Sequence, residues 1–283
     1  MRPPSAPWTD VPPVRARGRN TSPSPESRVD LIYVNGIITN PARQLAAMEE
    51  IAETLSVTEG LQAELRGVHA GTEGLLKDAV EATADKLGLG RNAAVETLRD
   101  TILEHLLEGR PINLVLSSQG TIIGSRALKE AKVSLTIEEG MSLGEVEALM
   151  GEKVRVLTAA NAQWTYPDGP HYRHFVNTED GITSLFGLGS ATSEGEGLQA
   201  RLRDGVGRAF AFAFAGFRAL LGRPGPALHP GRESEVTRFS RDLGAPFGEN
   251  HGLLEAYLDP VRGARASIME SFFMRASTGR ERP

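Results

Sequence analysis

Short apolar runs alternate with longer amphipathic segments along most of the chain. The stretches 29–37 (VDLIYVNGI) and 112–116 (INLVL) are nearly continuous in apolar residues. Such runs are typical of strands that are buried on both faces, as in parallel sheets. The segments 40–55, 92–108 and 119–131 instead place apolar residues at helical spacing, and we expect each to form a helix.

Capping residues support these helices. Asn40 and Pro41 are suited to the N-cap and the first helical position of one, while Asn92 and Gly109 bracket another. Further strands are predicted at 65–71, 154–160 and 171–177, with one more helix near 73–87. Strands that alternate with helices indicate an α/β fold, and we expect a three-layer α/β/α sandwich with a mostly parallel sheet.

The domain organisation follows from where this alternation begins and ends. Residues 1–27 are rich in Pro and Arg and lack an apolar pattern, which predicts a disordered tail or linker. A junction to a partner, a delivery module or an upstream domain is the alternative interpretation of that segment. Residues 28–275 are expected to form the folded α/β domain, and residues 276–283 a flexible tail.

Composition narrows the function classes. The chain has 283 residues, 40% of them hydrophobic, which is enough for a substantial core. A net charge of −5 argues against nucleic-acid binding, which normally requires a basic surface. The absence of cysteine excludes disulfides, thiolate zinc sites and cysteine nucleophiles.

Hydropathy bears on the cellular location. No uninterrupted apolar run is long enough to span a membrane, and the first residues lack the apolar core of a secretory signal. We therefore expect a cytoplasmic protein, with a non-classical export route left open.

Three places qualify as sites because chemistry in doubly wound sheets gathers at the carboxyl ends of the strands. They are Asn35–Gly36 after the first strand, Ser118 after the strand at 112–116, and residues 177–180 after the strand at 171–177.

Ser118 lies between a predicted strand and a predicted helix. A serine on such a tight turn exposes its hydroxyl, and the N–H of Gln119 can then bind an oxyanion in the same space. Gly120 would let strand and helix approach closely. The motif L-S-S-Q-G departs from the usual G-x-S-x-G at Leu116, whose side chain would crowd the turn. The alternative is that Ser118, or equally Ser117, is only a helix N-cap.

A nucleophilic serine requires a base and an orienting acid, which follow it in the order acid then histidine in this architecture. Asp180 follows a predicted strand and is the candidate acid, with Glu179 as the near alternative. Either carboxylate could instead cap a helix or sit in a loop. His251 precedes an amphipathic segment and is preferred as base over His229, which lies in a Pro/Gly loop with no organised element after it.

Other ligand-binding patterns are weak. His171 and His174 are three residues apart on a predicted strand, so their side chains should face opposite sides and not form a metal pair. The glycines near 88–90 and 187–197 lack the spacing of a dinucleotide or phosphate-binding loop.

In chain order, four motifs resemble the α/β-hydrolase superfamily, especially its lipase and esterase-like members. They are V-N-G-I at 34–37, L-S-S-Q-G at 116–120, N-T-E-D-G at 177–181 and H-G-L-L-E-A-Y-L at 251–258. The resemblance covers roughly residues 28–260.

The resemblance implies a Ser-Asp-His triad that needs neither a cofactor nor a metal. Ser118 would be the nucleophile, Asp180 the acid and His251 the base. The backbone N–H groups of Ile37 and Gln119 would bind the oxyanion. Supporting positions would be Gly120 and the pair Asn35 and Gly36, which matches the family's usual His-Gly.

A phenylalanine-rich segment at 207–222 bears on the substrate. Phe210, Phe214 and Phe217 would share one face of a helix there. This helix is either buried against the sheet or part of a lid or acyl-chain wall near 200–225 that contacts a lipid surface. The second interpretation favours lipid or phospholipid acyl esters as substrates. The sequence does not indicate an oligomeric state.

Two competing functions remain at this point. Leu116 and Asn35 depart from the family's pattern, so a non-catalytic α/β-hydrolase-like binding module is one alternative. The Pro/Arg-rich tail suggests another, in which a lipase-type enzyme is delivered into other cells as a toxin or effector.

Overall fold

A seven-stranded sheet forms the centre of the part of the protein that the structure describes. The computed structural model describes residues 14–15, 28–35, 41–59, 62–68, 92–188, 228–244, 251–257 and 272–273. The strands are β1 (Val14–Arg15), β2 (Arg28–Val34), β3 (Gln62–Val68), β4 (Ile112–Ser117), β5 (Val154–Ala159), β6 (His171–Asn177) and β7 (Ser234–Phe239). Their order is β1-β3-β2-β4-β5-β6-β7. Among these described strands, β1 alone pairs antiparallel, and the other six run parallel.

The strand order reverses direction at β2. From β2 the chain passes to β3 on one side, and then returns to place β4 on the other side of β2. In parallel sheets this reversal leaves a crevice at the carboxyl ends of the two strands beside it. The residues that follow β2 and β4, Asn35 and Ser118, therefore lie where a ligand would be expected.

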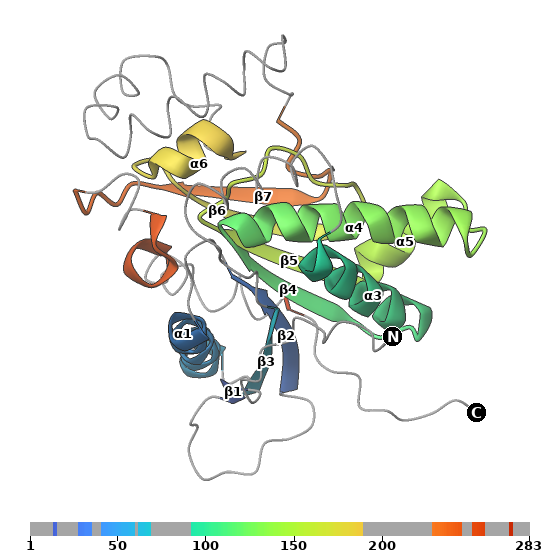
Figure 1. The fold of residues 1–283 in the computed structure, drawn as a ribbon, viewed down its shortest axis with the longest axis horizontal. Coiled ribbons are helices and arrows are strands. Elements are labelled where there is room, and N and C mark those ends of the chain that lie inside the picture. Colours follow the sequence, from blue (N-terminus) through green and yellow to red (C-terminus); the bar gives the residue numbers. More distant parts are fainter. Residues whose placement is uncertain are drawn as a thin grey trace.

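Helices cover both faces of the sheet, as Figure 1 shows. They are α1 (Pro41–Glu59), α3 (Ala93–Leu107), α4 (Gln119–Ile137), α5 (Leu143–Lys153), α6 (Gly181–Phe186) and the π-helical turn η4 (Leu253–Tyr257). One core joins α3, α4 and α5 to the sheet, and the other joins α1 and η4 to the opposite face. This confirms an α/β architecture with helices on either side of a mostly parallel sheet.

Strand β2 shows why both faces are apolar. Ile32 and Val34 belong to the core beneath α3 and α4, whereas Leu31 and Tyr33 belong to the core beneath α1. All four are buried. A central strand therefore needs a continuous apolar run, because successive side chains point to opposite faces.

The predicted helix at 92–108 is confirmed as α3, including both of its ends. The Asn92 side chain accepts hydrogen bonds from the N–H groups of Ala94 and Val95, at 2.9 and 3.3 Å. Past its end, Gly109 has a φ of 68°, a left-handed conformation that glycine adopts without strain.

Three features of the fold differ from the sequence-based expectations. Val14 and Arg15 lie in the segment expected to be disordered, yet they pair with β3 at the edge of the sheet. The loop around His229 was expected to lead to no organised element, but β7 begins at Ser234. Helix α5 was not predicted, although Ser142 and Glu145 form a capping box at its start.

Several predicted features lie outside the described residues. They are the helix near 73–87, the phenylalanine-rich segment with Phe210, Phe214 and Phe217, and the cap Asn40. Among the helices that the structure describes, none is long and apolar enough to cross a membrane.

Candidate active site

Ser118 occupies a sharp turn between β4 and α4. Its φ of 55° and ψ of −122° depart from the conformations that non-glycine residues prefer. The Ser118 side chain makes no capping hydrogen bond to α4, so it is not acting as a conventional N-cap. Ala160, which follows the neighbouring strand β5, is the other non-glycine residue with positive φ in the described part of the chain. Such strain is concentrated at functional sites.

Gly120 permits the close approach that this turn requires. A Cβ atom at this position would overlap the carbonyl oxygen of Val34, at the end of β2. The first turn of α4 is therefore held directly against the neighbouring strand. The N–H of Gln119, at the first position of α4, belongs to the helix-start groups that lack an intrahelical acceptor.

Leu116 does not crowd the turn as its place in the motif suggested. The side chain is fully buried and lies over Gly124 of α4, where an added Cβ would overlap Leu116 Cδ1. In the usual motif, a glycine at position 116 would leave space between the strand and the helix. Here Gly124 on α4 leaves that space, and the Leu116 side chain fills it. The departure from G-x-S-x-G leaves the turn intact.

Ser118, His251 and Asp180 form a continuous hydrogen-bonded chain. Ser118 Oγ lies 2.7 Å from His251 Nε2, and His251 Nδ1 lies 2.8 Å from Asp180 Oδ2. Because the ionised carboxylate only accepts, Nδ1 carries the proton and Nε2 is left to accept from the serine hydroxyl. The His251 side chain is 12% exposed and that of Asp180 is fully buried. The structure thus brings together three residues that are far apart in sequence.

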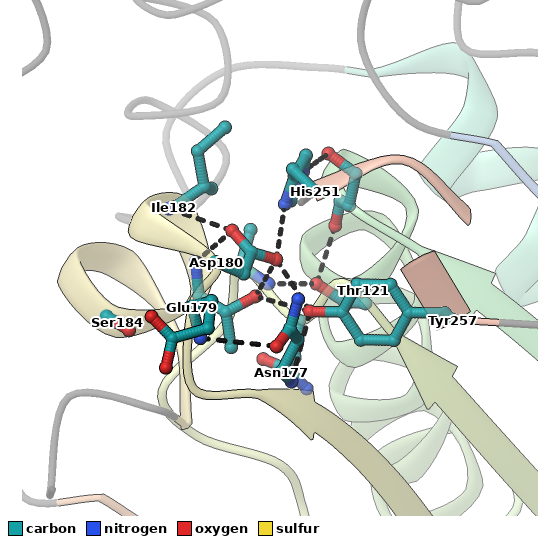
Figure 2. A network of polar contacts seen from close by, with 12 residues as sticks. Thr121, Asn177, Glu179, Asp180, Ile182, Ser184, His251 and Tyr257 are labelled. Carbon is teal, nitrogen blue, oxygen red and sulfur yellow. Dashed lines mark hydrogen bonds and ion pairs between the residues drawn. The ribbon is translucent and has the colours of Figure 1, made fainter. Parts of the chain in front are cut away.

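Asp180 is both part of this chain and the N-cap of α6. Its Oδ1 accepts from the backbone N–H groups of Ile182 and Thr183, at 2.9 and 3.1 Å. Its Oδ2 accepts from the Thr183 hydroxyl and the Tyr257 hydroxyl, each at 2.6 Å, besides His251. Figure 2 shows His251 and Tyr257 converging on this carboxylate. The sequence presented a helix cap and a partner of the histidine as alternative roles for Asp180. In the structure Asp180 has both contacts at once.

The alternative site residues point elsewhere. Glu179 Oε1 accepts from the hydroxyls of Thr178 and Ser240, at 3.3 and 3.1 Å. His229 Nε2 lies 3.0 Å from Asp168 Oδ1, in an exposed hydrogen bond. Ser117 is buried as the last residue of β4 and interacts with the Tyr33 side chain on β2.

No protein-family model matches the chain, and neither a curated protein nor a solved structure does. Among the residues described, no group of three or more His, Cys, Asp or Glu side chains could hold a metal ion.

The segment after β2 was expected to contribute Asn35, Gly36 and Ile37 to the site, and of these the structure describes Asn35. Gly36 and Ile37, the latter expected to be the second oxyanion donor, lie outside the described residues. Asn35 is described and fully buried at the end of β2, and its carbonyl oxygen also lies against Gly120. Its backbone thus helps to fix the start of α4.

A buried polar network holds the backbone of the turn at Ser118. The Thr121 hydroxyl donates to the carbonyl oxygen of Ser118 at 2.6 Å and accepts from the N–H of Ala162 at 3.0 Å. Asn161 Nδ2 donates to the Tyr166 hydroxyl at 2.8 Å and to Thr158 Oγ1 at 3.1 Å. The backbone of the candidate nucleophile is thereby tied to the loop after β5.

His174 lies at the far end of this network and is fully buried. Its Nδ1 lies 2.8 Å from Thr158 Oγ1, and its Nε2 lies 2.9 Å from the carbonyl oxygen of Pro230. Burial lowers the pKa of His174 to about 4, against an ordinary value of 6.5. The hydrogen bond to Pro230 acts in the opposite direction but only partly offsets the burial.

We expect His174 to make the protein less stable in mild acid. The unfolded chain takes up a proton on this imidazole below about pH 6.5, while the folded protein resists protonation until about pH 4. The free energy of unfolding should therefore fall as the pH is lowered through this window, by roughly 3 kcal/mol from this residue. Urea unfolding at pH 7 and pH 4.5 measures the change. In His174→Gln the loss should be much smaller, and an unchanged loss would assign the effect to other groups.

Tyr257, Thr183 and Thr121 belong to the site but were not predicted from the sequence. Thr183 stands three residues after Asp180, the spacing of a capping motif, and that signal could have identified it. Tyr257 and Thr121 carry no comparable signal, since each fits an ordinary helix pattern. Tyr257 bonds to Asp180 and Thr121 bonds to Ala162, and these long-range partners are apparent only in the fold.

Proposed function

We propose that the protein is a serine hydrolase that cleaves carboxylic esters through an acyl-enzyme. The observation that carries this proposal is the hydrogen-bonded chain from Ser118 Oγ through His251 to Asp180, on a strained turn at the reversal point of the sheet. Nucleophile, base and orienting acid stand in the relation that acyl transfer requires. Their order along the chain also fits the α/β-hydrolase resemblance of the sequence.

Acylation would proceed in two movements of a proton. Ser118 Oγ attacks the ester carbonyl carbon while His251 Nε2 takes the hydroxyl proton. The negative charge that develops on the carbonyl oxygen is stabilised by the N–H of Gln119 and, as we propose, that of Ile37. Collapse of this intermediate breaks the bond to the alcohol oxygen, which receives the proton from His251.

Deacylation repeats these steps with water. His251 Nε2 removes a proton from a water molecule, whose oxygen attacks the acyl carbon. The bond to Ser118 Oγ then breaks, and the serine regains its proton from His251 as the carboxylic acid leaves. Asp180 fixes the ring orientation throughout and stabilises the imidazolium that forms in each half of the cycle.

The geometry favours this reaction over a non-catalytic binding module. Leu116 and Asn35 motivated that alternative, and a turn obstructed by Leu116 would have supported it. The Leu116 side chain instead packs over Gly124. Acyl esters of lipids or phospholipids are the substrate class that we propose, on the basis of the resemblance and the phenylalanine-rich segment 207–222. A panel of esters that differ in acyl-chain length and head group would identify the preferred substrate.

Labelling with a fluorophosphonate probe tests the proposal directly. An activated serine attacks the phosphorus and expels fluoride, which leaves a stable Ser–O–P bond that mass spectrometry can locate. We expect the adduct on Ser118 and its loss in Ser118→Ala. Ser117→Ala is the matched control, because it removes the neighbouring hydroxyl and leaves the chain from Ser118 to Asp180 intact, so labelling should persist.

An adduct on Ser117, or none on folded protein with or without detergent micelles, would contradict the proposal. The micelle condition matters because a lipid-facing lid would keep the probe out in plain buffer.

A further inference from the structure

Two residues of one short stretch of chain contact the Asp180 carboxylate. His251 and Tyr257 are six positions apart in the sequence, and Tyr257 is the last residue of η4. His251 Nδ1 and the Tyr257 hydroxyl reach the same oxygen, Asp180 Oδ2, at 2.8 and 2.6 Å. The base and a second hydrogen-bond donor to the acid are therefore carried on a single piece of chain.

Packing alone does not account for the tyrosine. The Tyr257 ring is fully buried and meets Phe239 edge-on, with ring centroids 5.3 Å apart. A phenylalanine would satisfy those contacts. The hydroxyl, however, also accepts from the backbone N–H of Asn177 at 3.3 Å, which links the end of β6 to η4. Burial and the neighbouring Asp180 raise the pKa of Tyr257 well above its usual value, so the hydroxyl remains a donor at neutral pH.

We propose that Tyr257 is a positioning residue for the hydrolase reaction, which docks the segment carrying His251 onto Asp180 and moderates the charge that Asp180 presents to the imidazole. This inference rests on the proposed function. It assigns to Tyr257 two effects that can be separated, one mechanical and one electrostatic.

The mechanical effect comes from two-point attachment. With His251 and Tyr257 both bound to one oxygen, the segment cannot swing about the His251 contact alone. Displacement of a catalytic group by about 1 Å can cost roughly 100-fold in rate. Loss of the second attachment should therefore lower kcat and leave KM nearly unchanged, because Tyr257 is buried behind the acid.

The electrostatic effect concerns the acid limb of the pH–rate profile, which reports protonation of the general base. A hydroxyl that donates to the carboxylate reduces the attraction between Asp180 and a protonated His251. Removal of this donor should move the acid limb to higher pH. Of the charged groups in the described residues around the imidazole, Asp180 contacts it, while Glu179 is turned toward Thr178 and Ser240.

Tyr257→Phe is the test, and Thr183→Val is its matched control. Both substitutions remove a hydroxyl donor from Asp180 Oδ2, but Thr183 lies on α6 and not on the segment that carries His251. We expect the acid limb to move upward in both variants. We expect kcat to fall about 10- to 100-fold in Tyr257→Phe. In Thr183→Val the loss of kcat should be several-fold smaller. Equal losses of kcat would overturn the docking role, and an unchanged acid limb in Tyr257→Phe would overturn the electrostatic role.

A second variant guards against a folding defect in Tyr257→Phe. Replacement of Tyr257 by 3-fluorotyrosine preserves the packing and makes the hydroxyl a stronger donor. The acid limb should then move in the opposite direction, to lower pH. A shift to higher pH would contradict the proposal.

Proton NMR separates this inference from the proposed function. The His251 Nδ1 proton, shared with a buried carboxylate, should give a far-downfield resonance whether or not the protein hydrolyses esters. We expect that resonance to weaken and exchange faster in Tyr257→Phe. It should persist in Tyr172→Phe, which loses a buried hydroxyl bonded to the Pro167 carbonyl oxygen instead. A weaker and faster-exchanging resonance in Tyr257→Phe alone would support positioning even if no ester is cleaved, and an unchanged resonance in that variant would overturn it.

Discussion

Ser118→Ala should lower kcat for ester hydrolysis by at least about 10⁴-fold, since the acyl-enzyme can no longer form. The residual rate would come from the oxyanion donors and substrate binding. KM should change little because the hydroxyl contributes to bond formation more than to binding. The free energy of unfolding should remain within about 1 kcal/mol of the original value, because Ser118 Oγ makes no capping bond to α4.

A chromogenic ester panel and a denaturant titration measure these two quantities on the same preparations. Ser117→Ala serves again as the control, and we expect it to retain most of the activity. A Ser118→Ala protein that still hydrolyses esters within tenfold of the original rate would transfer the nucleophile's role to another group and refute the mechanism.

Asp180→Asn should reduce both activity and stability. Loss of the orienting carboxylate in a Ser-His-Asp arrangement lowers kcat by about 10⁴-fold, because the imidazole adopts the wrong tautomer. The amide also cannot replace the carboxylate structurally. In one orientation its NH₂ group faces the donors His251, Thr183 and Tyr257, and in the other it faces the N–H groups that start α6.

Either orientation leaves buried donors unsatisfied, so we expect the free energy of unfolding to drop by about 2–4 kcal/mol. Kinetics at saturating substrate and thermal unfolding measure the two losses. Glu179→Gln is the matched control, since it changes the adjacent carboxylate, whose partners are Thr178 and Ser240. Equal effects of the two substitutions would show that charge in this loop, and not the geometry at Asp180, governs the site.

The elements that could be predicted from sequence share one property, which is that local pattern and tertiary burial agree. The apolar run 112–116 became β4, and Asn92 and Gly109 bracketed α3 as expected. Strand β7 was missed because its residues, SEVTRF, are mostly half-buried or exposed, and they therefore lack the apolar run of a central strand. At its position at the edge of the sheet, polar side chains are normal.

The same reasoning explains which parts of the site could be anticipated. Ser118 directly follows β4 and Asp180 lies three residues after the end of β6, so topology alone brings both to one edge of the sheet. His251 was inferred from chain order and from the loop that carries it. Tyr257 could not be inferred, because a tyrosine in an apolar stripe predicts core packing, and its hydroxyl partner lies 77 residues away in sequence.

The pairing of Leu116 with Gly124 has a consequence for how such a site can change by mutation. Glycine at 116 alone would leave a cavity beneath α4, and a large residue at 124 alone would collide with the leucine. Each single step is harmful, while the exchange of both together restores the packing. The two positions are thus expected to show sign epistasis and to covary. A search pattern that demands glycine two residues before the nucleophile would overlook chains that have made the exchange.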